Sequence, residues 1–132
     1  MYVIAIIVIM LMFGSLRTLF TPTETRRHHI SLHYFLFLCI VYIIFMTGFA
    51  LLYLIFEMKG INVLLENGQH LEGDYQHHFF TTLYFSGVTL FSLGYGDISP
   101  IGIGRGIALI ESLLGFTVPA AFVVKTVLTV DH

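Results

Sequence analysis

The sequence predicts an all-α membrane protein. Long helices that span the bilayer flank a short helix that enters the bilayer without spanning it. Hydrophobic residues make up 57% of the 132 residues and charged residues only 11%, whereas about 25% charged residues is usual in soluble domains. The apolar residues also fall in runs long enough to cross a bilayer. The net charge of -2 shows no excess of basic residues, so no nucleic-acid partner is expected.

Residues 1–30 are expected to form a hydrophobic helix and a basic cytoplasmic linker. The apolar stretch ends near Leu16, ahead of the first positive charge at Arg17, so it lacks the basic start of a signal peptide. We therefore expect a retained helix. It either crosses the bilayer or lies partly in the interface, because Gly14 and Ser15 weaken its end.

The charges of the connecting segments predict the orientation. Arg17, Arg26 and Arg27 lie in or before the first linker, whereas residues 57–74 contain four acidic residues against the single Lys59. The positive-inside rule places the basic linker in the cytoplasm and the acidic segment outside. We expect a multi-pass protein of the cell membrane whose partner is the lipid bilayer and whose C-terminus is cytoplasmic.

The first long helix is expected at about residues 31–58. Its apolar run from Tyr34 to Phe56 is interrupted only by Thr47 and Gly48. At about 1.5 Å per residue this run spans roughly 35 Å, which exceeds the hydrocarbon thickness of about 30 Å. This outer helix should therefore cross the membrane.

A shorter apolar stretch follows at residues 77–91, and as a helix it reaches only roughly 20 Å. Asp74 is a suitable N-cap, so we expect a re-entrant helix at about residues 75–91. Irregular backbone comes next, and at membrane depth such backbone occurs only where it is buried in protein or lines a water-filled path.

The irregular segment, residues 92–97, reads SLGYGD. Gly94 and Gly96 tolerate positive φ, so successive carbonyl groups can point to one side. The Tyr95 side chain then points away from them and can pack against the short helix, and Ser92 adds a hydroxyl oxygen. Rings of carbonyl oxygens replace the hydration shell of potassium in ion filters.

The last helix is expected at about residues 102–128, with an apolar run from Ile107 to Val124. Glu111 is the one acid within it, and an intramembrane carboxylate needs a partner. We expect it to bond to the short helix or to a neighbouring subunit, with Thr81 or Thr82 as the donor. A buried structural acid is favoured over an ion site or a pH sensor.

The stretch TLFSLGYGDISP, residues 89–100, resembles the filter of the two-transmembrane potassium channel family, usually read T-x-x-T-V-G-Y-G-D. The resemblance extends over roughly residues 31–127, which makes residues 31–132 the pore domain. It implies an ion path lined by the filter and K+ as the permeant ion, without a cofactor or enzymatic activity. The filter residues are Ser92, Leu93, Gly94, Tyr95 and Gly96, and the first four of them hold K+.

One filter strand cannot surround an ion, so a single copy per chain predicts a homotetramer with fourfold symmetry. Residues around the filter depart from the family pattern. Tyr84 and Phe85 stand where many relatives have tryptophans. Tyr84 can still donate to Asp97 at the outer mouth, whereas Phe85 has no donor for the Tyr95 hydroxyl. Val88 replaces a glutamate that some relatives place behind the filter.

The resemblance places a gate on the last helix. Gly115 matches the family's hinge glycine, and Pro119 adds a kink because it removes a helical hydrogen bond. Phe116 and Ala120 are expected to face the cavity. The alternative for Gly115 is close helix packing.

Two other functions fit parts of the pattern. Leu93 and Ser92 replace the usual valine and threonine, so a weakly selective monovalent cation channel is an alternative. The sequence Gly94-Tyr95-Gly96-Asp97 also matches the G-x-G-D motif of intramembrane aspartyl proteases. That chemistry needs a second carboxylate that shares a proton with the first, and the other aspartates, Asp74 and Asp131, lie outside the apolar runs. Arginines at every third position are absent, so no voltage sensor is expected, and a regulatory partner outside this chain can supply gating.

Overall fold

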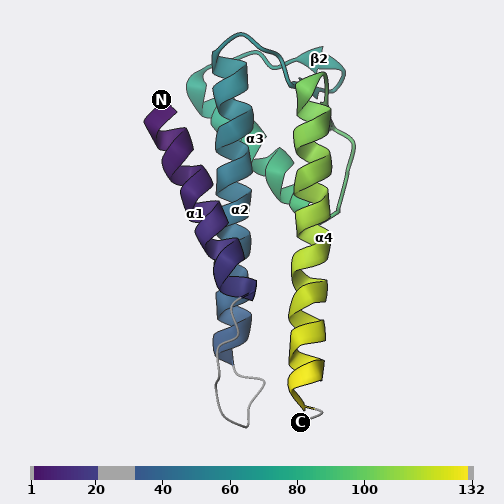
Figure 1. The fold of residues 1–132 in the computed structure, drawn as a ribbon. Helices are drawn as coiled ribbons and strands as arrows, with labels where there is room; N and C mark the ends of the chain where they lie inside the picture. Colours follow the sequence, from purple (N-terminus) through teal and green to yellow (C-terminus); the bar gives the residue numbers. More distant parts are fainter. Residues whose placement is uncertain (1, 21–31, 131–132) are drawn as a thin grey trace.

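Two long helices lie side by side with a short helix between them in the computed structural model, which describes residues 2–20 and 32–130. Helix α2 (Leu32–Met58) and helix α4 (Ile103–Val130) run antiparallel (Figure 1). Helix α3 (Tyr75–Leu90) descends from the end where α2 finishes to the middle of α4, and residues 91–102 return to the same end. Residues 75–102 therefore enter the space between α2 and α4 and leave it at the same end, as expected of a re-entrant segment.

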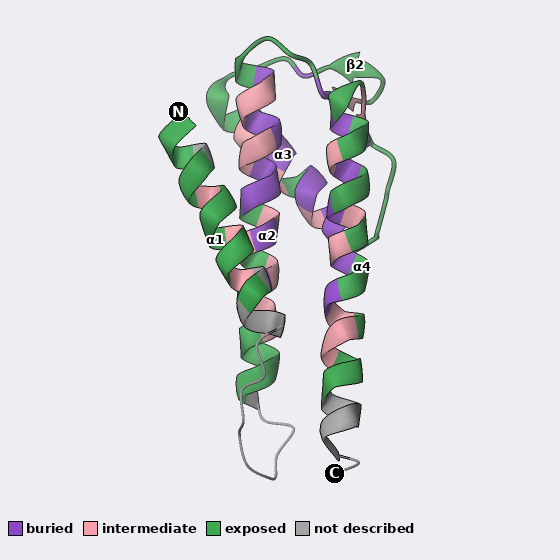
Figure 2. Cartoon of the chain, viewed as in Figure 1, coloured by how far each residue is buried: buried purple, intermediate pink, exposed green. Residues whose placement is uncertain are grey.

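Both long helices are long and apolar enough to cross a membrane. The apolar spans are His33–Met58 and Ile103–Lys125, with mean hydropathies of 2.7 and 2.1. Only 28% and 22% of their most apolar stretches are buried within the chain, so much of the surface of both helices is left uncovered (Figure 2). Such faces are suited to lipid or to other membrane helices. The predominantly helical membrane fold is thus confirmed.

Helix α1 (Tyr2–Phe20) lies along α2 in the opposite direction and extends beyond the predicted end near Leu16. The helices approach closely at Gly48, where a Cβ atom would lie 2.5 Å from Met12 Sδ. At the other end the Lys59 ammonium group lies 2.7 Å from the Tyr2 hydroxyl and 4.0 Å from the centre of its ring. The linker arginines 26 and 27 lie outside the described residues.

The core forms where α2, α3 and α4 meet, on the side of the molecule where the connecting loops lie. Tyr53 is fully buried and packs edge-on against Phe85, with ring centres 5.1 Å apart. The buried apolar residues of this core are Val41, Phe45, Phe49, Tyr53, Val63, Leu64, Leu71, Phe85, Leu90, Ile98, Ala108 and Val118.

A small antiparallel sheet, absent from the all-α prediction, covers the loop end of the helices. Its strand order is β2 (Gln69–His70), β1 (Leu64–Glu66), β3 (Ile98–Pro100). Asn67 and Gly68 form the two-residue turn between β1 and β2, with φ of 49° and 82°, and Asn-Gly is the preferred sequence for such a hairpin. The Asn-Gly pair was visible in the sequence, but the strands of the hairpin are too short to show an alternation of apolar and polar residues, so the hairpin was not predicted.

The sheet is attached to the helices by buried polar contacts. Glu57, at the end of α2, accepts hydrogen bonds from the backbone N–H groups of Val63 and Leu64 at 2.7 and 2.9 Å. The Val63 carbonyl accepts from Ile101 N at 2.8 Å, and a Cβ atom on Gly104 would lie 2.3 Å from the Val63 oxygen. The start of α4 is therefore held against the outer loop.

Candidate functional site: the segment after the short helix

Residues 92–97 alternate between two backbone conformations. Ser92, Gly94 and Gly96 have φ of 57°, 56° and 83°, and the residues between them do not have positive φ. Glycine reaches this left-handed region without strain, whereas serine reaches it at a cost. The alternation was expected at the two glycines, and the structure extends it to Ser92.

The last turn of α3 fixes the start of this segment. The Val88 carbonyl accepts from Leu93 N at 2.8 Å and from Gly94 N at 3.4 Å, and the Thr89 carbonyl accepts from Ser92 N at 3.1 Å. Val88 was noted in the sequence only for the missing glutamate. Its backbone oxygen holds the segment instead, a contribution that does not depend on the side chain.

Contacts with the hairpin and with α3 fix the other end at Asp97. The Asp97 carbonyl accepts from Asn67 N at 2.8 Å, and the neighbouring Ile98 pairs with Glu66 in the sheet. The Tyr84 side chain lies close enough to Asp97 to interact with it electrostatically, and the expected hydrogen bond from Tyr84 to Asp97 stays a prediction.

The middle of the segment is uncovered in the single chain. The side chains of Leu93 and Tyr95 are 56% and 68% exposed, and a Cβ atom on Gly94 or Gly96 would meet no atom within 4 Å. The Phe85 ring is buried and packs against Tyr53 of α2. The described part of this chain therefore holds the segment at both ends and leaves the residues between them exposed.

Glu111 belongs to a separate buried cluster where α4 contacts α2 and α3. Its Oε2 atom accepts from the Tyr53 hydroxyl at 2.8 Å and its Oε1 atom from the Ser86 hydroxyl. The short helix is thus a partner, as expected, but Thr81 and Thr82 are not the donors. Helix α4 crosses α3 farther along, at Ser86, and the Thr82 hydroxyl bonds to a carbonyl of its own helix at 3.0 Å.

A hollow of about 420 Å³ opens below the segment, on the side away from the hairpin. Phe116 and Ala120, both expected to face a cavity, contribute to its wall and are exposed. The other lining residues are Tyr42, Leu90, Phe91, Ser92, Gly115, Pro119 and Val123.

Gly115 touches the end of α3. A Cβ atom there would lie 2.0 Å from the Leu90 carbonyl oxygen and 3.2 Å from the Leu90 Cα atom. Close packing alone therefore requires glycine at this position, which was the alternative to the hinge. Bending at Gly115 stays a prediction.

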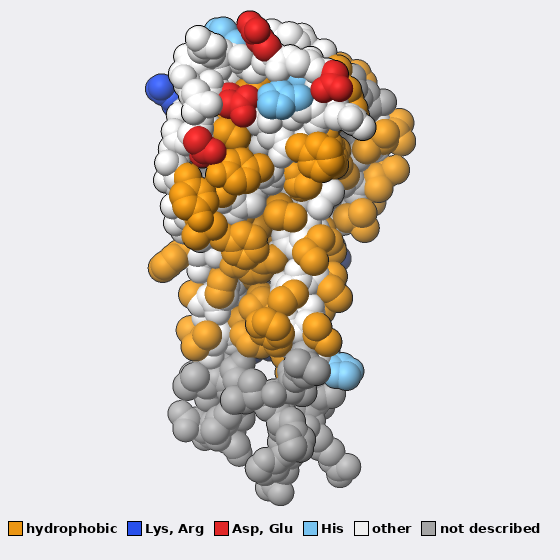
Figure 3. Space-filling view, turned by 180° about the vertical axis from the view of Figure 1, so that it is seen from behind, with side chains coloured by type: hydrophobic (Ala, Val, Ile, Leu, Met, Phe, Trp, Pro, Cys, Tyr) orange, Lys and Arg blue, Asp and Glu red, His pale blue; other side chains and the backbone are white. Residues whose placement is uncertain are grey.

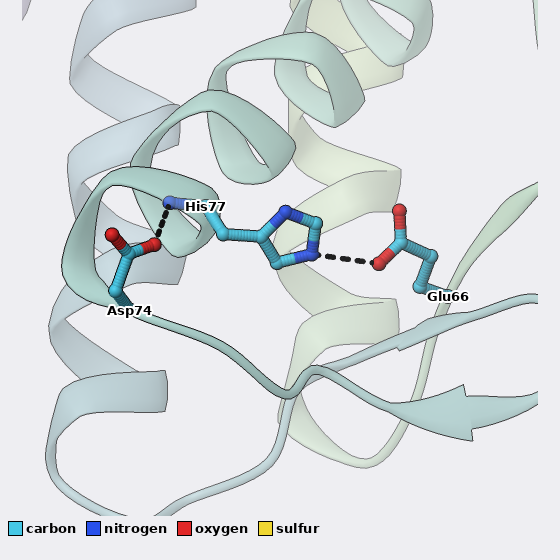
Figure 4. Close-up of polar contacts among 3 residues, drawn as sticks. All are labelled: Glu66, Asp74 and His77. Atoms are coloured by element: carbon cyan, nitrogen blue, oxygen red, sulfur yellow. Dashed lines mark hydrogen bonds and ion pairs between the residues drawn. The ribbon is translucent and has the colours of Figure 1, made fainter.

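Acidic and histidine side chains gather at the hairpin end, above a broad hydrophobic band (Figure 3). The Asp74 carboxylate caps α3 as predicted, accepting from His77 N at 3.1 Å, and the His77 ring lies 2.9 Å from Glu66 (Figure 4). Within residues 2–20 and 32–130 no group of three or more histidine, cysteine or acidic side chains is arranged to hold a metal ion.

Comparison with known proteins identifies the class. The sequence model of a family described as "Ion channel" matches residues 37–130, and the chain belongs to this ion channel family. It is 37% identical over 126 residues to Protein LctB of Bacillus caldotenax and 36% identical to Protein LctB of Geobacillus stearothermophilus. Each match covers 96% of this chain and 94% of the relative. No solved structure matches the chain significantly.

Proposed function

We propose that this membrane protein is a potassium-selective channel that conducts K+ passively across the cell membrane. The observation that carries the proposal is the alternating backbone of residues 92–96, with positive φ at every second residue. In that geometry the peptide carbonyls of Ser92, Leu93, Gly94 and Tyr95 can face one side and replace the hydration shell of K+. Membership of the ion channel family supports this reading.

Four chains complete the filter in this proposal. The segment is held at both ends by its own chain, whereas Leu93 and Tyr95 stay exposed along its length. A ring of oxygens around an ion needs several such segments, and a cyclic homotetramer supplies them with one symmetry operation. The exposed apolar faces of α2 and α4 provide surfaces for neighbouring chains and lipid.

The orientation follows from charge. The hairpin end carries the acidic residues around Asp97, and this end forms the extracellular mouth. Lys125 lies toward the opposite end of α4, so the C-terminus is cytoplasmic, as the basic residues 17, 26 and 27 also indicate. Tyr84 and Asp97 then support the outer end of the filter, and Glu111 supports α3 from behind.

The gate lies in the second half of α4 in this proposal. Phe116 and Ala120 line the hollow below Ser92, and Pro119 interrupts the hydrogen bonding of the helix beside them. A change in the direction of α4 at this level alters the width of the path that four chains enclose.

The reversal potential in a planar bilayer, with KCl on one side and NaCl on the other, tests selectivity. We expect a value close to the potassium equilibrium potential. A value near zero in the presence of current would favour the weakly selective cation channel, because serine and leucine at positions 92 and 93 would then have loosened the filter. Proteolytic activity without ion current would favour the G-x-G-D protease.

A further inference from the structure

Pro119 leaves one buried carbonyl group without its helical donor. In an α-helix each N–H group donates to the carbonyl four residues earlier, and proline has no N–H group. The residue four positions before Pro119 is Gly115, which is buried where α4 meets the end of α3. Within a membrane such a carbonyl needs a donor from elsewhere in the protein.

Tyr42 of α2 supplies that donor. Its hydroxyl lies 2.5 Å from the Gly115 carbonyl oxygen, although the two residues are 73 positions apart in the sequence. The ring of Tyr42 also stacks on Phe91, with centres 5.3 Å apart and an angle of 17° between the planes. One side chain thus contacts both the proline-interrupted turn of α4 and the residue directly before Ser92.

Residues of α2 and α4 meet the end of α3 at the same place. The Leu90 carbonyl fits against Gly115 only because glycine has no side chain. We call Tyr42, Leu90, Phe91 and Gly115 the three-helix junction. All four line the hollow below the filter segment, so a change at the junction alters the wall of the hollow.

We propose that Tyr42 is a positioning residue for gating, which sets the conformation of α4 by occupying the carbonyl that Pro119 leaves free. The inference rests on the proposed function, since it assumes that α4 carries the gate. Bending of α4 at Pro119 redirects the Gly115 carbonyl and separates it from the Tyr42 hydroxyl. Stacking of Tyr42 on Phe91 connects this movement to the start of the filter.

A double-mutant cycle tests the inference. Tyr42→Phe keeps the ring and removes the hydroxyl, whereas Pro119→Ala restores the missing N–H group. We expect Tyr42→Phe to change the open-to-closed ratio of single channels about fivefold in the wild type, the size expected for one hydrogen bond. In the Pro119→Ala background the change should fall below twofold, because the helix then satisfies the Gly115 carbonyl.

Reversal potentials should stay at the wild-type value in all variants, since no filter residue is altered. Tyr75→Phe, at the exposed start of α3, is the matched control and should leave the ratio unchanged. An equal effect of Tyr42→Phe in both backgrounds, or no effect in either, would overturn the inference.

Thermal unfolding of the wild type, Tyr42→Phe, Pro119→Ala and the double variant in detergent separates this inference from the proposed function. Tyr42→Phe should lower the unfolding temperature of the wild type more than that of Pro119→Ala. If the wild type carries no current, the proposed function fails, and this unfolding cycle still decides the hydrogen-bond coupling. Additive shifts in unfolding temperature would overturn it.

Discussion

Two polar regions lie next to the apolar helices, and the chain completes one of them and leaves the other open. The Glu111 carboxylate is fully buried, and both of its oxygens accept hydrogen bonds from Tyr53 and Ser86 of the same chain. Residues 92–97 are exposed, and within the described residues their backbone hydrogen bonds run to the last turns of α3 at one end and to Asn67 of the hairpin at the other.

The difference distinguishes polar groups that stabilise the fold from polar groups that are available for function. Buried polar groups must find partners, and in a membrane water cannot supply them in the hydrocarbon region. A cluster that satisfies itself within one chain stabilises the helix packing. A segment that stays exposed along most of its length in one chain is where other copies and a permeant ion can supply the partners. The variants below test this distinction, from the largest expected effect to the smallest.

Gly96→Ala should remove selective potassium current. The glycine has φ of 83°, and an alanine there is strained by about 1–2 kcal/mol in the left-handed region, so the segment should leave its alternating conformation. The reversal potential in asymmetric KCl and NaCl should move toward zero, or the current should vanish.

The matched control is Gly106→Ala on α4, where a Cβ atom also meets nothing within 4 Å and φ is not positive. This variant should conduct like the wild type. Normal potassium selectivity in Gly96→Ala would contradict the role given to the alternating backbone.

Glu111→Ala should destabilise the protein by about 1–3 kcal/mol, because it leaves the buried Tyr53 hydroxyl without its acceptor and leaves Ser86 with the Met46 carbonyl alone. Unfolding in detergent measures the loss. Glu111→Gln retains an acceptor oxygen and should assemble and keep the wild-type reversal potential. A current from Glu111→Gln that lost its selectivity would place Glu111 in the filter rather than in the helix packing.

Gly115→Ala should lower stability by about 1–3 kcal/mol, because the new methyl group meets the Leu90 backbone, which cannot move aside as a side chain can. Gly106→Ala on the same helix again serves as the control. If Gly115→Ala unfolds like the wild type and only its open probability changes, Gly115 acts as a hinge and not as a packing contact.

Glu66→Gln should have the smallest effect. The Glu66 and His77 side chains are 34% and 43% exposed, and exposed ion pairs contribute at most about 1 kcal/mol. The unfolding temperature in detergent should change by no more than a degree or two, and the reversal potential should stay constant. A large loss of stability would show that this pair holds the hairpin against α3.

Much of the fold follows from the sequence because the apolar runs are long and the breaks between them are clear. The outer helix was expected at about 31–58 and occupies Leu32–Met58, and the short helix was expected at 75–91 and occupies Tyr75–Leu90. Asp74, a suitable N-cap, correctly indicated the start of the short helix. The hairpin was missed because its strands have only two or three residues, although Asn67-Gly68 marks its turn.

The partners within the site were harder to predict. Glu111 was expected to contact the short helix, but the sequence does not fix the level at which two helices cross, so Ser86 and Tyr53 could not be chosen over Thr81 and Thr82. The positive φ of Ser92 could not be predicted, because glycine is the usual indication of positive φ and position 92 is a serine. The contact of Tyr42 with Gly115 joins residues 73 positions apart, and only the absence of an N–H group at Pro119 pointed to a free carbonyl.

A cryo-electron microscopy map of the protein purified in potassium chloride would test the central claim most directly. We predict a fourfold assembly with residues 92–96 around the axis, their carbonyl oxygens facing inward, and ion density between successive oxygen rings. A different symmetry, or a fourfold assembly in which residues 92–96 lie away from the axis, would contradict the claim that other copies of the chain complete this segment.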